Sequence, residues 1–186
     1  MQNPAKLVTN KLPKLLAAFD ALVQKDVLVG VPKAKTARQD DPIGNATIAY
    51  LMDNGSPANN VPARPFMRPG IKRATSQIKA EFKIAASAVL TGNEGLVNAS
   101  LNRAGLAAQN AIRGVITEGI PPPLKPETIK NRARARGAKS MRKGEKEYMK
   151  RIAEGATPAE AQASVGITPL VNTGQLRNSI TYSIRK

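Results

Sequence analysis

The acidic residues decide whether this chain can do catalysis, because a metal-dependent nuclease needs two or more converging carboxylates. Of its 13 acidic residues only Asp40 and Asp41 are adjacent, in a stretch rich in turn formers, and an adjacent pair makes a weak site. The chain has no Cys and no His, which excludes thiol nucleophiles, the usual transition-metal sites and the commonest general base. Phosphate-binding GxxxxGK[ST] loops and GxSxG elbows are also absent from the sequence. We therefore expect no enzyme, no cofactor and no metal.

The charge of the chain indicates binding instead. Lys and Arg number 29, for a net charge of +16, and an excess of this size is typical of proteins that meet DNA or an acidic protein surface. Residues 125–151 hold eleven basic residues against three Glu. Six of these basic residues are candidates for contact with DNA or an acidic partner: Arg132, Arg134, Arg136, Lys139, Arg142 and Lys143.

Any contact with DNA should be independent of sequence. Tyr148 is the only aromatic residue in the basic block, so stacking on bases, as in single-strand binders, is not expected. Zinc-finger ligands are missing and no recognition-helix pattern stands out. The interpretation left open at this point is non-specific contact with the DNA backbone or docking on acidic protein.

Hydropathy patterning predicts a single α+β domain over residues 1–186. Apolar residues at helical spacing predict an amphipathic helix over Pro4–Gln24, and two long helices over Gly70–Leu90 and Glu94–Thr117. β-branched and alternating patterns predict strands at Val27–Val31 and Ser179–Arg185. We expect these two strands to pair in a small antiparallel sheet that packs against the two long helices.

The segments between these elements are predicted to be loops and short helices. Residues 33–43 are interpreted as a flexible loop, and Val61–Phe66 as an edge of the sheet. Asn45 or Thr47 would cap a short helix that ends at Asn54-Gly55. Residues 125–166 would form a basic helical excursion from the domain, with one helix opening at Pro126 and another at Thr157-Pro158. The N-terminus has no apolar run typical of a secretory signal, and no membrane partner is expected.

Two segments carry the most specific pattern. Residues 45–71 read NATIAYLMDNGSPANNVPARPFMRPGI, and residues 169–186 read PLVNTGQLRNSITYSIRK. Together they resemble the neck or tail-completion (head–tail joining) family of long-tailed bacteriophages, in which an "IAxxxxxGS … IPARPFLRPGI" element and a "(D/N)TGxLRxSI" element recur at opposite ends of a small domain. Lys33–Asp41 and Lys139–Gly166 lie outside the resemblance.

This resemblance implies a structural virion protein, assembled in the host cytoplasm, rather than an enzyme. Family members form rings between the DNA-filled head and the tail, around the channel through which the genome leaves. The implied partners are further copies of the chain in a hexameric ring, a head-closure or connector protein, a tail terminator or tail tube protein, and genomic DNA through non-specific contact. The alternatives are a free non-specific DNA-binding protein, a sibling role as tail terminator or minor tail protein, and a nuclease.

Four residues of the two motifs are interface candidates: Arg64, Phe66, Arg68 and Arg177. An aromatic side chain flanked by guanidinium groups is typical of an anchor on a partner. For Phe66 we rank a role in pinning the loop to its own core first, which leaves Arg64 and Arg68 as the better interface candidates. Arg177 has no evident local need. The resembled family often has an acid where this chain has Asn172, so a salt bridge from that position is not expected.

Overall fold

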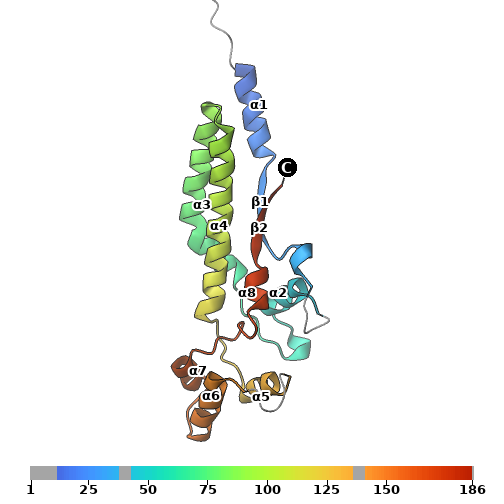
Figure 1. The fold of residues 1–186 in the computed structure, drawn as a ribbon, viewed down its shortest axis with the longest axis vertical. Coiled ribbons are helices and arrows are strands. Elements are labelled where there is room, and N and C mark those ends of the chain that lie inside the picture. The colour runs from blue at the N-terminus through green and yellow to red at the C-terminus, as the bar shows by residue number, and fades with distance from the viewer. Residues whose placement is uncertain (1–11, 38–42, 136–140, 186) are drawn as a thin grey trace, which may run out of the picture.

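The computed structural model describes residues 12–37, 43–135 and 141–185. Within these ranges the chain is mainly helical, with one two-stranded antiparallel sheet, and its elements are arranged along one long axis (Figure 1). The sheet lies against a pair of long helices, which confirms the predicted α+β class. None of the helices in the described ranges is long and apolar enough to cross a membrane.

The long helices are α3 (Met67–Leu90) and α4 (Glu94–Glu118), which form an antiparallel hairpin. Asn93 caps α4, since its side chain accepts a hydrogen bond from the Leu96 amide at 3.0 Å. Small residues line much of the buried face of α3, including Gly70, Ala74 and Ala85. The two helices therefore approach each other closely, as the alanine-rich sequence predicts.

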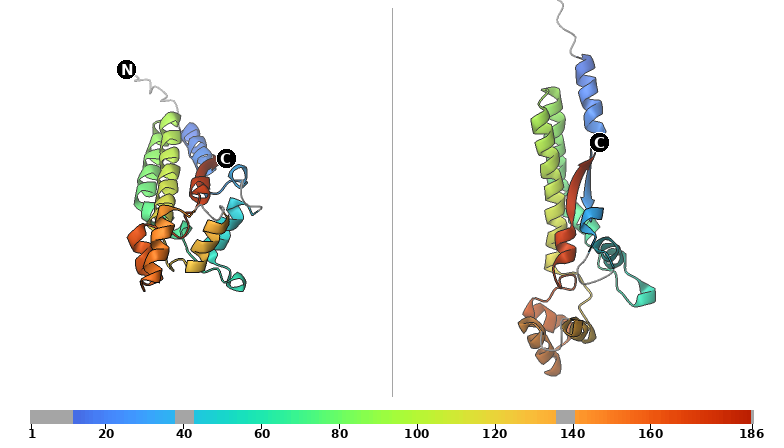
Figure 2. Two further views of the ribbon diagram at one scale, coloured as in Figure 1. Left: turned by 60° about the horizontal axis from the view of Figure 1, so that its bottom comes forward. Right: turned by 45° about the vertical axis from the view of Figure 1, so that its right-hand side comes forward.

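Both strands lie where the sequence places them, within two residues. β1 (Asp26–Gly30) pairs with β2 (Thr181–Arg185), and Val27 stands opposite Ile184 in the register. The pairing joins the early part of the chain to its C-terminal segment, and Figure 2 shows the two strands running beside α4. The predicted antiparallel pairing of the two strands is confirmed.

Two details of the predicted strands are wrong. β2 begins at Thr181 rather than Ser179, because Ser179 closes the short helix α8 (Gln175–Ser179), where its hydroxyl donates to the carbonyl of Leu176 at 2.7 Å. Val61–Phe66 adds no edge to the sheet in the described part of the chain; Val61 makes only an isolated bridge to Ser56. Prolines at positions 62 and 65 lack the amide donors that a strand ladder needs.

Helix α1 (Leu12–Val23) lies within the predicted Pro4–Gln24, and the residues before Leu12 lie outside the described ranges. Its Ala18, Phe19 and Leu22 pack on a cluster formed by the C-terminal part of α3 and the N-terminal part of α4. From there α1 extends past the turn that joins α3 to α4 (Figure 1).

Short elements surround the first motif. Helix α2 (Asn45–Asn54) ends at Gly55, as predicted, and Gly55 has a positive φ of +78° that favours glycine. Its N-cap is Gly44 rather than Asn45, because the Asn45 side chain donates to the carbonyl of Lys35 at 3.1 Å. Two turns of 3-10 helix flank α2, at Lys33–Lys35 and Pro57–Asn59. Residues 38–42 of the predicted flexible loop lie outside the described ranges.

The basic segment folds around a small core of its own. It contains α5 (Pro126–Ala135), α6 (Lys143–Ala153) and α7 (Pro158–Val165), which gather at the end of the molecule opposite α1 (Figures 1 and 2). The residues buried there are Leu124, Ile129, Tyr148 and Ala161. Thr157 caps α7 in a reciprocal pair with Glu160, as the sequence predicts.

Candidate interface and polyanion-binding surfaces

The two motif segments, which lie far apart in the sequence, meet in one core cluster. Phe66 of the first motif and Leu176 of the second are buried in the same group, with no exposed surface on Phe66. Ile112 and Ile116 of α4 complete the contact between them. Phe66 is thus a core residue of its own chain, as the sequence analysis ranked first.

A carboxylate inside the first motif holds the start of α3. Oδ1 of Asp53 accepts hydrogen bonds from the backbone amides of Phe66 at 2.7 Å and Met67 at 3.0 Å. These amides would otherwise lack partners in the first turn of a helix. This contact explains why α3 begins at Met67 rather than at the predicted Gly70. The sequence analysis did not single out Asp53 within the first motif, because its hydrogen-bond partners are thirteen and fourteen positions away.

The loop between Asp53 and Phe66 is held tightly against itself. A Cβ added to Gly55 would lie 2.8 Å from the backbone nitrogen of Ala63, so the turn has no room for a side chain. The backbone amide of Arg64 donates to the carbonyl of Met52 at 2.7 Å. Each of three residues thus holds part of this loop in place: Asp53 by its hydrogen bonds, Gly55 by allowing the tight turn, and Phe66 by its place in the core.

The guanidinium of Arg64 is directed into its own chain. Only 6% of Arg64 is exposed, and its Nε and Nη2 atoms donate to the carbonyl oxygen of Pro122 at 3.2 and 2.8 Å. Burial lowers the pKa of Arg64 from its usual value. The structure thus gives this interface candidate an intramolecular contact, whereas Arg68, in the first turn of α3, is exposed.

The second motif shapes the turn that leads into β2. Gly174 adopts a left-handed conformation with φ of +80° at the start of α8, and Leu176 follows in the core. Nε of Arg177 donates to the hydroxyl of Thr117 on α4 at 2.9 Å. Arg177 is half-buried and touches α4, so part of its donor capacity is used within the chain.

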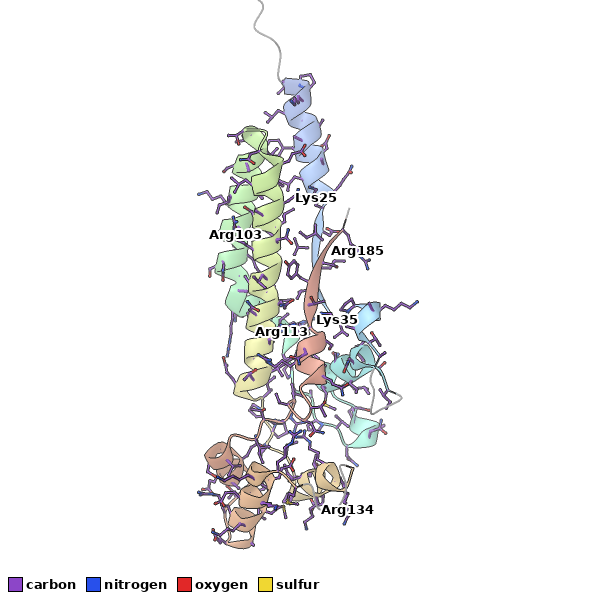
Figure 3. All side chains as sticks on the ribbon, in the orientation of Figure 1. Lys25, Lys35, Arg103, Arg113, Arg134 and Arg185 are labelled. Atoms are coloured by element: carbon purple, nitrogen blue, oxygen red, sulfur yellow. The ribbon has the colours of Figure 1, made fainter. Side chains whose placement is uncertain are left out.

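Arg113 is a residue that the sequence analysis missed. Its Nη2 donates to the carbonyl of Ile180 at 2.6 Å, and its Nε to the same oxygen at 3.1 Å, which fixes the junction between α8 and β2 (Figure 3). Burial lowers the Arg113 pKa, and the nearby charge of Arg177 lowers it further. The available signal was a single cation between the buried Ile112 and Val115 of α4.

No protein-family model, curated protein or solved structure matches this chain. The residues themselves therefore carry the functional argument. In the described ranges no group of three or more acidic residues lies close enough to hold a metal ion.

The structure divides the six candidates of the basic block. Arg132 donates to the carbonyl of Pro169 at 2.5 Å, and Arg142 donates to the carbonyl of Asn172 at 2.7 Å, so both tie the basic segment to the second motif. Arg134 and Lys143 are exposed. Arg136 and Lys139 lie outside the described ranges.

Further cations of α6 have acidic neighbours. Lys150 lies 3.9 Å from Glu154, and Arg151 lies 3.4 Å from Glu147, each one turn apart on the helix. These pairs lower the net charge that α6 presents to a polyanion. The basic segment is therefore less free to bind DNA than its composition indicates.

A shallow pocket lies where the second motif faces α2 and α5. Its lining includes Ile48, Met52, Arg132, Leu170 and Leu176. Arg132 is already bonded to a backbone carbonyl of this pocket wall. The pocket therefore belongs to the packing between the motif segments and the basic segment.

Proposed function

We propose that this chain is a structural virion protein of the head–tail interface of a long-tailed bacteriophage. In this role it forms a ring, hexameric by analogy with the resembled family, that joins the DNA-filled head to the tail around the genome channel. One observation carries the proposal: the two motif segments on which the resemblance rests converge in a single core, through Phe66 and Leu176.

This convergence supports the proposal because it explains the pattern physically. Asp53 holds the start of α3, Gly55 allows the tight turn, and Gly174 turns the chain into α8. Residues with such tasks specify a fold, so a shared pattern of them favours a shared fold. The functional part of the proposal then rests on the resemblance to the neck and tail-completion family.

The form of the molecule is compatible with a ring built by contacts between unlike surfaces. α1 and the tip of the hairpin lie at one end, and α5 to α7 lie at the other (Figure 1). Contacts between different surfaces of neighbouring copies close into a ring when the rotation between copies closes. The exposed Arg68 and the partly exposed Arg177 are the remaining interface candidates among the motif residues.

Electron microscopy of particles made without this protein tests the proposal. Filled heads that accumulate beside separate tails of normal length would support a role in joining. Purified chain added to such heads and tails should then restore joined particles. Normal virions in the absence of the protein would contradict the proposal.

The same micrographs distinguish a neck protein from a tail terminator. A tail terminator stops growth of the tail tube, so its loss should give tails of abnormal length. Normal-length tails without heads would favour the neck role, and overlong tails would favour the terminator role.

A free DNA-binding protein is the second candidate. The observation that favours it is the net charge of +16 together with exposed cations such as Arg134 and Lys143. It requires tight, salt-dependent binding to DNA and normal virion assembly in the absence of the protein.

A further inference from the structure

A stripe of basic side chains runs along the outward face of α3. It consists of Arg68, Lys72, Lys79 and Lys83, all of which are exposed. The three lysines lie four, eleven and fifteen positions after Arg68, and these separations are close to one, three and four turns of an α-helix. The four side chains therefore project from one face, over about 22 Å at 1.5 Å per residue. We call them the α3 stripe.

The α3 stripe lies opposite the face that packs on α4. The buried residues of α3 include Ala74, Ala85 and Val89, which share the face toward the hairpin partner and α1. α4 and the sheet lie on one side of α3 in Figure 1 and in the left-hand view of Figure 2. The stripe is thus a solvent-facing surface of the described chain.

The acidic residues of α3 and of the C-terminal end of α4 do not neutralise the stripe. Glu81, the only acid within α3, pairs with Arg103 of α4 at 2.9 Å. Glu118 at the end of α4 pairs with Arg73 at 2.6 Å. Both carboxylates are therefore bonded to other guanidinium groups, and the positive potential along the stripe is left without a matching acid from α3.

The composition of the stripe favours a polyanion over a protein partner. Three of its four residues are Lys, which is depleted in protein–protein interfaces, whereas aromatic residues and Arg are enriched there. Lys acts as a hydrated point charge and lacks the planar guanidinium with which Arg binds both oxygens of a carboxylate. A row of such charges suits the phosphate backbone of DNA, where affinity comes from counterion release and needs no sequence readout.

We propose that the α3 stripe contacts the phosphate backbone of duplex DNA without sequence preference. This deepens the proposed function, because it assigns the contact with the genome to a surface different from the basic block at 125–151. In that block Arg132 and Arg142 bind backbone carbonyls of their own chain. In the stripe, by contrast, the described structure shows four exposed cations in one row.

Salt dependence of DNA binding by the full chain tests the proposal. The probe is a duplex of arbitrary sequence, and binding is followed by fluorescence anisotropy from about 50 to about 200 mM salt. Each phosphate contact contributes about 0.9 to the slope of log Kobs against log salt. We expect the triple variant Lys72→Gln, Lys79→Gln, Lys83→Gln to lower the magnitude of the slope by about 2.7.

A matched variant controls for net charge. Lys130→Gln, Lys143→Gln and Lys146→Gln remove three exposed lysines from α5 and α6, so both triple variants carry the same net charge. We expect the control to keep the wild-type slope to within about 0.5, because its lysines make no contact with the duplex in this proposal. Far-UV circular dichroism and the urea midpoint establish that both variants are folded.

The proposal would be overturned by no measurable binding of wild-type protein at low salt, by an equal loss of slope in both variants, or by a loss confined to the control. Loss of head–tail joining in the α3 variant with unchanged DNA binding would assign the stripe to a protein partner. If the triple variant does not fold, Lys79→Gln alone should lower the slope by about 0.9. Head–tail joining is scored by microscopy, so failure of the DNA contact is distinguishable from failure of the proposed function.

Discussion

Arg64 donates two hydrogen bonds to the backbone carbonyl oxygen of Pro122, from Nε at 3.2 Å and from Nη2 at 2.8 Å. The loop before α3 is thereby joined to the connector that leads into α5. A guanidinium suits this task because its rigid fork can direct two donors at one acceptor. Arg64 therefore links the motif core to the basic segment through these two hydrogen bonds.

Replacing Arg64 should destabilise the chain. Arg64→Ala removes both hydrogen bonds that the buried guanidinium donates, so we expect the free energy of unfolding to fall by about 1.5 to 3 kcal/mol. Urea denaturation measures the change. Arg68→Ala is the control, because this exposed neighbour should change stability by less than about 0.5 kcal/mol. Equal effects of the two variants would contradict an internal role for Arg64.

Asp53 should be required as an acceptor for the start of α3. Asp53→Ala removes the acceptor for the amides of Phe66 and Met67, and we expect a loss of about 1 kcal/mol, as for other helix caps. Asp53→Asn keeps an acceptor oxygen and should lose less. Thermal unfolding of the three proteins checks the order. If Asp53→Asn were as unstable as Asp53→Ala, the charge rather than the acceptor would be the stabilising feature.

Two glycines of the hairpin should respond in opposite directions to the same substitution. A Cβ at Gly70 would lie 2.6 Å from the Cα of Ile112 on the facing helix, so Gly70→Ala must separate α3 from α4, at a cost of about 1 to 3 kcal/mol. A Cβ at Gly114 of α4 would meet nothing within 4 Å. Gly114→Ala should therefore stabilise the chain by about 0.5 to 1 kcal/mol through helix propensity.

The free energy of unfolding from urea titrations measures both variants. Because the substitution is the same, a general effect of alanine on α-helix content cancels between them. Tolerance of Gly70→Ala would contradict the close packing of α3 against α4, and destabilisation by Gly114→Ala would contradict the open space beside Gly114.

Tyr148 should make the stability of the chain depend on alkaline pH. Its side chain has no exposed surface and its hydroxyl donates to the carbonyl of Leu124 at 2.9 Å. Burial, with a smaller contribution from the charge of Glu127, raises the Tyr148 pKa above its usual value of 10.0. Above about pH 10 the unfolded state therefore loses this proton first, and the folded state loses stability until pH passes the folded pKa.

Tyr148→Phe isolates this contribution. At neutral pH the variant should be less stable by about 0.5 to 1.5 kcal/mol, the net value of one hydrogen bond. As pH rises through 10 the difference between the two proteins should shrink, because only the wild-type protein has the tyrosine to ionise. Urea midpoints of both proteins at neutral and alkaline pH provide the measurement, and a difference independent of pH would contradict a raised pKa.

Local patterns in the sequence predicted the helices and strands well. The two long helices α3 and α4 follow from apolar spacing, and α7 follows from Thr157 and Pro158. The errors lie at element ends and at the edge strand. α3 begins early because Asp53 satisfies its first amides, and Ser179 belongs to α8 rather than to β2. Contacts over long sequence distances decide such ends, and spacing does not reveal them.

The candidate site was less predictable than the fold. Composition drew attention to residues 125–151, but hydrogen bonds to Pro169 and Asn172 use two of the predicted DNA-binding arginines within the chain. The α3 stripe has an ordinary appearance in the sequence, because its four residues are spread over sixteen positions. A basic surface depends on which cations find internal acceptors, and that is a property of the packed chain.

The sequence by itself determined the class of the fold, the two long helices, the paired strands and the absence of His and Cys, since these follow from composition and from short-range periodicity. The tertiary structure alone decided that the two motifs share one core, that Arg64, Arg113 and Arg132 bond to carbonyls of their own chain, and that the four cations of the α3 stripe are exposed. The physical reason is that burial and hydrogen bonding select partners by distance in space. Residues separated by many positions become neighbours only when the chain has folded.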